Sequence, residues 1–324
     1  MIYKAGTTPL DRVATEDETY RIATGEDIES LVGSIATSGL INPPVLLPIE
    51  NRQYRIVCGF SRIMACLKLG WQQVDARLLA ADTPPVRCAQ IAIADNAFGR
   101  DLNPVEISRA INLLSADLSD DAAVAEAAGR AGLPLVAAAI PRFRTLISLP
   151  LHYQAGIIAE TLPLPIAERL PHLAAADAEA VFELFSEIRP GLNVQREILD
   201  NAQETAIREG ASVWDVLTGG DVMQIREDAD LQRPHKIALI RKLMKFRRYP
   251  ALTAAEERFN RRAGELGLPG NVKLVPPAGF EGPDYSLKLK FSSLEQLNEQ
   301  KKIIEQLLTS DVLQEILGKR GALI

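Results

Sequence analysis

The chain of 324 residues has few cysteines and histidines, with three of each. Cys58, Cys66 and Cys88 lack the paired spacing of a zinc site, and three cysteines do not make a disulfide framework. No apolar run approaches the roughly 18 residues of a membrane helix, and the N-terminus lacks the apolar region of a secretory signal. We therefore expect a cytoplasmic protein with no membrane partner and no metal site made of cysteines.

The charge of the chain is unevenly distributed. Its formal net charge is −6, which excludes a basic coat over the whole surface. Ten Lys and Arg residues nevertheless lie between Arg233 and Arg262, where the acids are Glu256 and Glu257. A basic segment on an acidic body is typical of a polyanion site, and its alternative is an ordinary solvated helix face.

The spacing of apolar residues, glycines and prolines predicts an α+β protein with three folded parts. After an N-terminal tail over residues 1–19, residues 20–118 alternate helical and short strand patterns, typical of a small mixed α/β domain. Residues 119–232 form short helices broken by Gly and Pro, which predicts an all-α domain. Residues 233–324 begin with a basic helix and continue as a small αββα domain.

The stretch "IVCGFSRIMACLKLG" allows two interpretations. Cys58 precedes a glycine and a helix, so it is a candidate nucleophile, but strand alternation places it on the buried face as filler. Alternatively, Gly59 opens a strand-to-helix turn whose free N–H groups bind an anion, with Arg62 adding contacts. The structural alternative is a tight turn beside a solvated arginine.

The stretch "ADNAFGRDLNPVE" carries an acid, an amide and an arginine before a well-capped helix. Asn103 at the N-cap, Pro104 at N1 and Glu106 at N3 form a helix-start signal. Asp95 is a candidate Mg²⁺ ligand and Arg100 a candidate phosphate ligand, and the alternative is a polar interdomain turn.

Three stretches resemble, in their order and spacing, the N-terminal domain of ParB-type chromosome and plasmid partition proteins. They are "IESLVGSIATSGLINPPVLL", "YRIVCGFSRIMACLKLGW" and "ADNAFGRDLNPVEISRAINLL". That fold is shared with sulfiredoxin, whose cysteine follows the glycine, where this chain has Phe60. The resemblance implies a clamp that binds and slowly hydrolyses CTP with Mg²⁺. By position, it assigns the metal ligands Asp95 and Asn96, and the nucleotide-binding residues Gly39, Pro43, Gly59, Ser61, Arg62, Asn96 and Arg100.

Three positions depart from the family pattern. The family has two adjacent arginines after its glycine, whereas here Arg62 stands alone. The arginine expected four residues after the metal-site acid aligns with Gly99, one residue before Arg100. The arginine loop near the start of the domain is not evident. These departures leave hydrolysis of the nucleotide open.

The resemblance also covers the later parts. Residues 119–232 resemble a degenerate helix-turn-helix domain, because "GLPLVAAAIPRFRTLI" has alanines and Pro141 where base-reading polar groups are expected. The sequence therefore predicts DNA binding through phosphates with little base preference. The predicted DNA-binding residues are Arg142, Arg144, Arg241, Lys242, Lys245, Arg247 and Arg248.

The C-terminal part resembles the family's dimerisation domain. "YSLKLKF" alternates apolar and polar residues, and the helix after it carries an apolar stripe, so a homodimer is expected. The predicted interface residues are Leu287, Leu289, Phe291, Leu297, Ile304 and Leu308.

The resemblance implies a DNA-associated segregation protein, near the nucleoid and with a ParA-type ATPase as a possible partner. The alternative is a non-catalytic adaptor that binds a protein through the same fold. A nuclease is a third class, and no acidic cluster in the sequence supports it.

Overall fold

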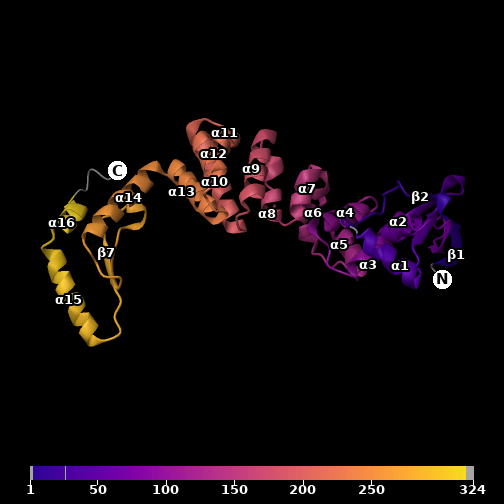
Figure 1. Cartoon of the computed structure of the whole chain (residues 1–324), viewed down its shortest axis with the longest axis horizontal. Helices are drawn as coiled ribbons and strands as arrows, with labels where there is room; N and C mark the ends of the chain where they lie inside the picture. The colour runs from indigo at the N-terminus through magenta and orange to yellow at the C-terminus, as the bar shows by residue number, and fades with distance from the viewer. Residues whose placement is uncertain (1–2, 26, 319–324) are drawn as a thin grey trace. The chain divides into compact units, whose positions relative to one another are not determined.

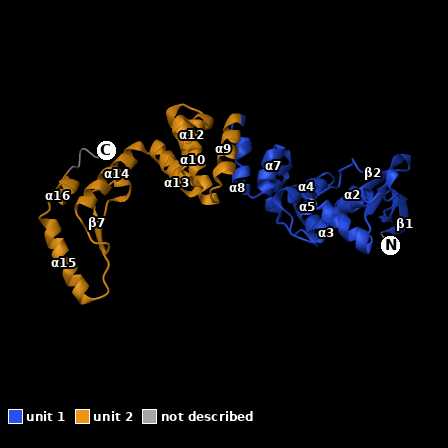
Figure 2. Ribbon diagram, viewed as in Figure 1, with its two compact units in different colours: residues 1–175 blue, residues 176–324 orange. Residues whose placement is uncertain are grey.

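The computed structural model describes residues 3–25 and 27–318 and contains two compact units, residues 1–175 and 176–324 (Figure 2). The elements follow one another as mixed α/β, then helical, then a short hairpin with flanking helices (Figure 1). The predicted α+β class is confirmed. Within the described ranges no helix is both long and apolar enough to cross a membrane.

The first unit is built on a five-stranded sheet with the order β1-β5-β3-β4-β2. Its central strands read "VLLP" and "YRIVC", which are apolar on both faces. Leu46 and Ile56 pack with helices α1 and α2 on one face, while Val45 and Val57 pack with α3 and α4 on the other. The strands and helices of this layer are β1 Lys4–Pro9, β2 Val13–Ala14, β3 Val45–Pro48, β4 Tyr54–Cys58, β5 Gln73–Leu78, α1 Ile28–Ser38, α2 Phe60–Lys68, α3 Pro85–Ala97 and α4 Pro104–Ser115.

The N-terminal segment is part of this sheet, which corrects the expected tail over residues 1–19. β1 pairs antiparallel with β5 and β2 pairs parallel with β4, so the two edge strands both come from residues 4–14. Strand signals are weak there because "KAGTTP" contains Gly and Pro, which are depleted in strands. Pro9 ends β1 at the edge of the sheet, where a missing N–H is tolerated.

Short helices complete the first unit: α5 Asp121–Arg130, α6 Ile140–Arg144, α7 Leu151–Ile158 and α8 Leu164–Ala167. The segment expected as a recognition helix is divided into a 3-10 turn at Ala137–Ala139, α6, and a second 3-10 turn at Leu146–Ser148. Pro141 lies in the first turn of α6, where its missing N–H costs nothing.

The second unit contains a helical part and a hairpin. Its elements are α9 Ala175–Ile188 (which begins at the unit boundary), α10 Leu192–Glu209, α11 Val213–Thr218, α12 Gly220–Glu227, α13 Arg233–Arg248, α14 Pro250–Glu265, β6 Val272–Val275, β7 Ser286–Leu289, α15 Leu294–Leu308 and α16 Asp311–Gly318. The order α14, β6, β7, α15 is the expected αββα arrangement, and β6 and β7 pair antiparallel. The domain boundaries at residues 118 and 232 stay predictions.

The buried carboxylate of Glu106 joins three segments of the first unit. The residue is 1% exposed. Its oxygens accept hydrogen bonds from the backbone N–H of Thr24 at 2.9 Å and of Asn103 at 3.1 Å, and from both terminal nitrogens of Arg100 at 2.6 and 2.7 Å. The Asn103 side chain in turn accepts from the N–H groups of Val105 and Glu106, which completes a capping box at the start of α4.

Glu106→Gln should lower the free energy of unfolding of the first unit by about 1.5–3 kcal/mol, because it weakens the charge-assisted hydrogen bonds that a buried carboxylate accepts. Trp71 and Trp214 are the two tryptophans of the chain, so in a Trp214→Phe background urea unfolding followed by fluorescence reports the first unit. Glu126→Gln is the matched control: it breaks the exposed pair with Arg130 and should cost under about 0.5 kcal/mol.

Burial raises the pKa of Glu106, but hydrogen bonds from Arg100, Thr24 and Asn103 outweigh it, and its pKa lies below the ordinary value of 4.5. The stabilisation is therefore present above pH 4.5 and is lost as pH falls through the lower pKa of the folded state. Glu106→Gln should remove this part of the acid dependence. Equal costs for the two variants would contradict the role of Glu106.

Candidate functional site

Gly59 makes the turn between strand β4 and helix α2. Its φ of 91° lies in the left-handed region that favours glycine. A Cβ at this position would lie 2.9 Å from the Cβ of Pro44 and 3.0 Å from the Nε of Arg62. Glycine is thus required twice, by the backbone conformation and by the close approach of the β3 loop and the arginine.

Arg62 lies in the first turn of α2 and is held from two sides. Its guanidinium donates to the backbone oxygen of Asn42 at 3.0 Å and to Oδ2 of Asp95, on α3, at 2.6 Å. The predicted phosphate ligand and the predicted metal ligand are therefore bonded to each other. The Arg62 side chain is 18% exposed, so an anion arriving from solvent still has access to it.

A pocket of about 230 Å³ brings most of the predicted nucleotide residues together. Gly59, Ser61, Arg62, Asp95 and Asn96 all line it. Tyr20 and Arg21 line it too, and these two were missed from the sequence. Arg21 lies on the segment before α1, where no arginine loop was evident from the sequence. The sequence could have indicated Arg21, because the apolar Ile22 beside it is buried in the core and holds this segment against the domain.

The other predicted nucleotide residues lie around this pocket. Arg100 lines a neighbouring pocket with Ser61 and Asn96, but its guanidinium is bound to Glu106. Pro43 lines a third pocket, on the other side of the Arg62–Asp95 pair. Gly39 caps the C-terminus of α1 with a φ of 74°.

Cys58 does not fit a nucleophile. The residue is 4% exposed, and burial, together with the negative charge of Asp95, raises the pKa of its thiol to about 12. A thiol with this pKa is protonated at neutral pH and unreactive. Cys58 is therefore a core residue. Among the described residues no group of three or more His, Cys, Asp or Glu could hold a metal ion, and Asp95 and Asn96 are two oxygen donors only.

The predicted DNA-binding side chains all have partners within their own unit. In the first unit Arg142 pairs with Glu168, and Arg144 with Asp121 at 2.6 Å. In the second unit helix α13 pairs with both of its neighbours. The contacts are Arg241 with Glu197, Arg247 with Glu209 and Arg248 with Asn201 on α10, and Lys242 with Glu257 and Lys245 with Glu256 on α14.

The basic character of α13 therefore serves packing within the second unit. Its apolar side, with Ile240 and Met244 fully buried, faces the unit interior. Arg241, Lys242, Lys245 and Arg247 pair with acids on α10 and α14, and Arg248 bonds to the amide of Asn201. The partners on α10 were not expected, because Glu197 and Glu209 are about forty residues from the arginines that they pair with. Whether these residues also contact DNA stays a prediction.

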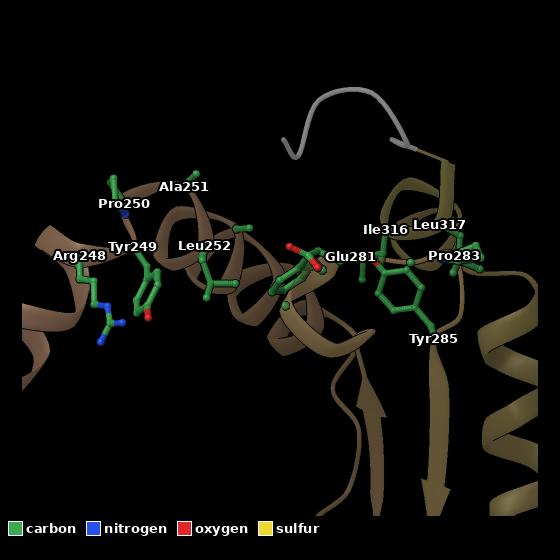
Figure 3. A pocket seen from close by; sticks show the side chains of 14 residues that line it. Arg248, Tyr249, Pro250, Ala251, Leu252, Glu281, Pro283, Tyr285, Ile316 and Leu317 are labelled. Carbon is green, nitrogen blue, oxygen red and sulfur yellow. The ribbon is translucent and has the colours of Figure 1, made fainter. Parts of the chain in front are cut away.

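A larger pocket of about 640 Å³ lies within the second unit (Figure 3). Tyr249, Leu252, Tyr285 and Ile316 point toward it, from the start of α14, the start of β7 and from α16. Its lining is mixed: aromatic and apolar side chains lie beside the charged groups of Arg248 and Glu281. It shares none of the predicted nucleotide residues.

Comparison with known proteins identifies one domain within the first unit. Residues 8–97 match the model of the ParB N-terminal domain. Residues 8–97 of this chain are thus a ParB N-terminal domain. The ParB N-terminal domain begins inside β1 and ends with α3, so it contains the Gly59 turn, Arg62 and the Asp95–Asn96 pair.

The chain is related to nucleoid occlusion proteins. It is 28% identical over 164 residues to that of Geobacillus sp. (strain WCH70), covering 50% of this chain and 55% of the relative. It is 34% identical over 79 residues to that of Bacillus cereus (strain AH187), covering 24% and 27%. The chain thus matches about half the length of the first of these relatives, and less of the second.

Solved ParB structures overlap the chain loosely. C-terminally truncated ParB from Caulobacter crescentus complexed with CTP-gamma-S is 20% identical with a TM-score of 0.26, covering 56% of this chain and 98% of that chain. A Pnob8-like ParB-N domain is 15% identical with a TM-score of 0.42, covering 56% and 89%.

Gly59→Ala should destabilise the first unit by about 1–3 kcal/mol more than Gly70→Ala, because of overpacking against Pro44 and Arg62. Gly70 is the matched control: its φ of 73° carries the same backbone cost, and nothing lies within 4 Å of an added Cβ. Urea unfolding in the Trp214→Phe background measures the difference. Equal losses in the two variants would show that only the backbone conformation matters at Gly59.

Proposed function

We propose that this chain is a DNA-associated protein of the ParB and nucleoid occlusion group, whose N-terminal pocket binds the phosphates of a nucleoside triphosphate. The Arg62–Asp95 pair beside the Gly59 turn carries this proposal. The pocket offers a guanidinium, the N–H groups at the start of α2 and an adjacent carboxylate, which suit an anion together with a cation. CTP is the expected nucleotide, from the resemblance.

Binding of a phosphate with Mg²⁺ would replace the Arg62–Asp95 ion pair by two contacts, Arg62 with the phosphate and Asp95 with the metal ion. A phosphate that reaches Arg62 replaces Asp95 as the partner of the guanidinium, and Asp95 then becomes available beside Asn96 as an oxygen ligand. Two such donors fit Mg²⁺, which is usually held by one or two protein oxygens together with phosphates and water. When bound, Mg²⁺ would neutralise part of the phosphate charge.

Arg62→Ala should weaken triphosphate binding at least ten-fold, because a charge-assisted hydrogen bond contributes about 1.5–3 kcal/mol. Isothermal titration of the whole protein with each of the four nucleoside triphosphates, with and without Mg²⁺, measures this. Arg130→Ala, which removes an exposed arginine on α5, is the control and should bind like wild type.

Asp95→Asn gives a second, opposite readout. It removes the competitor for Arg62, so binding without Mg²⁺ should become tighter while the dependence on Mg²⁺ is lost. A pocket assignment that is wrong would leave both Arg62→Ala and Asp95→Asn equal to wild type.

DNA association is supported by a second surface, on the hairpin of the second unit. Lys273 and Lys288 are directly opposite each other in the β6–β7 ladder, and Lys290 follows two residues later on the same exposed face. Like charges directly opposite each other in a sheet are destabilising. In the described part of the chain none of the three forms an ion pair with an acid, so a phosphate backbone would relieve their repulsion.

Replacing Lys273 and Lys288 together by Ala should flatten the salt dependence of DNA binding. Each phosphate contact contributes about −0.9 to the slope of log affinity against log salt, so the slope should fall by about 1.8. The pair Lys242→Ala and Lys245→Ala removes the same charge from α13 and should change it less, because those lysines already have acid partners. A larger effect of the α13 pair would return the DNA contact to that helix.

A homodimer through the C-terminal part belongs to the same proposal. Leu287 and Leu289 are half-buried, as are Leu297 and Ile304, while Phe291 is 54% and Leu308 72% exposed. A second copy of the hairpin and of α15 would cover them. A ParA-type ATPase partner and a place at the nucleoid rest on the resemblance alone.

The second candidate function is a non-catalytic adaptor. The pocket between α14, β7 and α16 favours it, because aromatic and apolar side chains with Arg248 and Glu281 beside them suit a protein segment that carries both apolar and charged groups (Figure 3).

A further inference from the structure

We propose that Arg77, on strand β5, is the second arginine of the phosphate site and contacts the terminal phosphates of the bound anion. The proposal rests on the proposed function. It adds a residue from strand β5 to a site otherwise made of the Gly59 turn, α2 and α3.

Arg77 and Arg62 line the same pocket. Its volume is about 440 Å³, and its other lining residues include Asn42, Pro43, Cys58 and Asp95. Cys58, Arg62 and Asp95 also line the pocket at the Gly59 turn, so the Arg62–Asp95 pair lies between the two spaces. An anion that separates this pair is in contact with both.

The backbone holds Arg77 in place there. The N–H of Arg77 donates to the backbone oxygen of Pro44 at 2.9 Å, and Pro44 is the residue packed against the Gly59 turn. Arg77 is also opposite Val45 in the parallel β3–β5 pairing. The strand and the turn therefore share one anchor, and the arginine needs no loop movement to face the pocket.

The charge of Arg77 is not matched by an acid. Arg62 is neutralised by Asp95, whereas the guanidinium of Arg77 lies 6.0 Å from the ring of Tyr3 and, among the described residues, forms no ion pair. The nearest acid on its own strand face, Asp75, accepts a hydrogen bond from Thr7 and does not line the pocket. The pocket thus carries an excess of positive charge.

This excess of positive charge should favour ligands with a longer phosphate chain over those with a single phosphate. A monophosphate satisfies Arg62 alone, while a triphosphate has enough charge and length to occupy both arginines. Arg77 is accordingly a specificity-determining residue for polyphosphates over monophosphates, and planar guanidinium groups suit such contacts.

The test compares wild type, Arg77→Ala and Arg77→Lys by isothermal titration with CTP, CMP and inorganic triphosphate. Arg77→Ala should bind CTP and inorganic triphosphate at least ten-fold more weakly and CMP less than three-fold more weakly, with Arg77→Lys between them. Arg87→Ala, an exposed arginine on α3 bonded to Gln90, is the matched control and should equal wild type. Thermal unfolding confirms that each variant is folded.

The outcomes separate the two proposals. Triphosphate affinity unchanged in Arg77→Ala overturns the role of Arg77 and leaves the nucleotide site standing. An equal loss for CMP and CTP in a folded variant also overturns it, because it shows that Arg77 does not distinguish a triphosphate from a monophosphate. If wild type binds inorganic triphosphate but no nucleotide, the nucleotide function fails. The role of Arg77 is then tested by comparing the triphosphate affinities of wild type, Arg77→Ala and Arg77→Lys. If wild type binds neither, both proposals fail.

Discussion

The first unit depends on one buried charge, the carboxylate of Glu106. A buried carboxylate is stable only when each of its oxygens is hydrogen-bonded. Here the donors come from Thr24, before α1, from Arg100, after α3, and from Asn103, at the start of α4. The chain segments around the candidate pocket are thus joined to a single carboxylate. The same contact explains why Arg100, although close to the pocket, is a structural residue in this state.

The candidate site and the core are built from the same residues. Gly59 ends a core strand, Cys58 before it is buried, and Arg62 begins a helix whose apolar face packs on the sheet. The ion pair of Arg62 with Asp95 joins α2 to α3 across the sheet edge, and it keeps both side chains positioned before any ligand arrives. Preorganised groups of this kind lose little freedom on binding.

Much of this was predictable from sequence because its signals are local. The paired strands around residues 50–53, the helix after Gly59 and the capping box at Asn103 each lie within a few residues. The partners of Arg241, Arg247 and Arg248 on α10 are some forty residues away, so the sequence shows a basic run and the structure shows a set of matched pairs. The position of Arg77 near the Gly59 turn could not be predicted for the same reason, since β5 lies beside β3 only in the folded sheet.

The edge strands of the sheet have a consequence for folding. Lys4 pairs with Leu78 and Val13 with Tyr54, so the first two strands of the domain pair with strands that lie far along the sequence. Pairings between residues so far apart carry a large loop-closure entropy and slow the folding of a domain. The central β3–β4 hairpin closes over a short turn and is the natural nucleus. During synthesis, residues 13–14 could pair once β4 is made, whereas residues 4–9 would remain unpaired until β5 is complete.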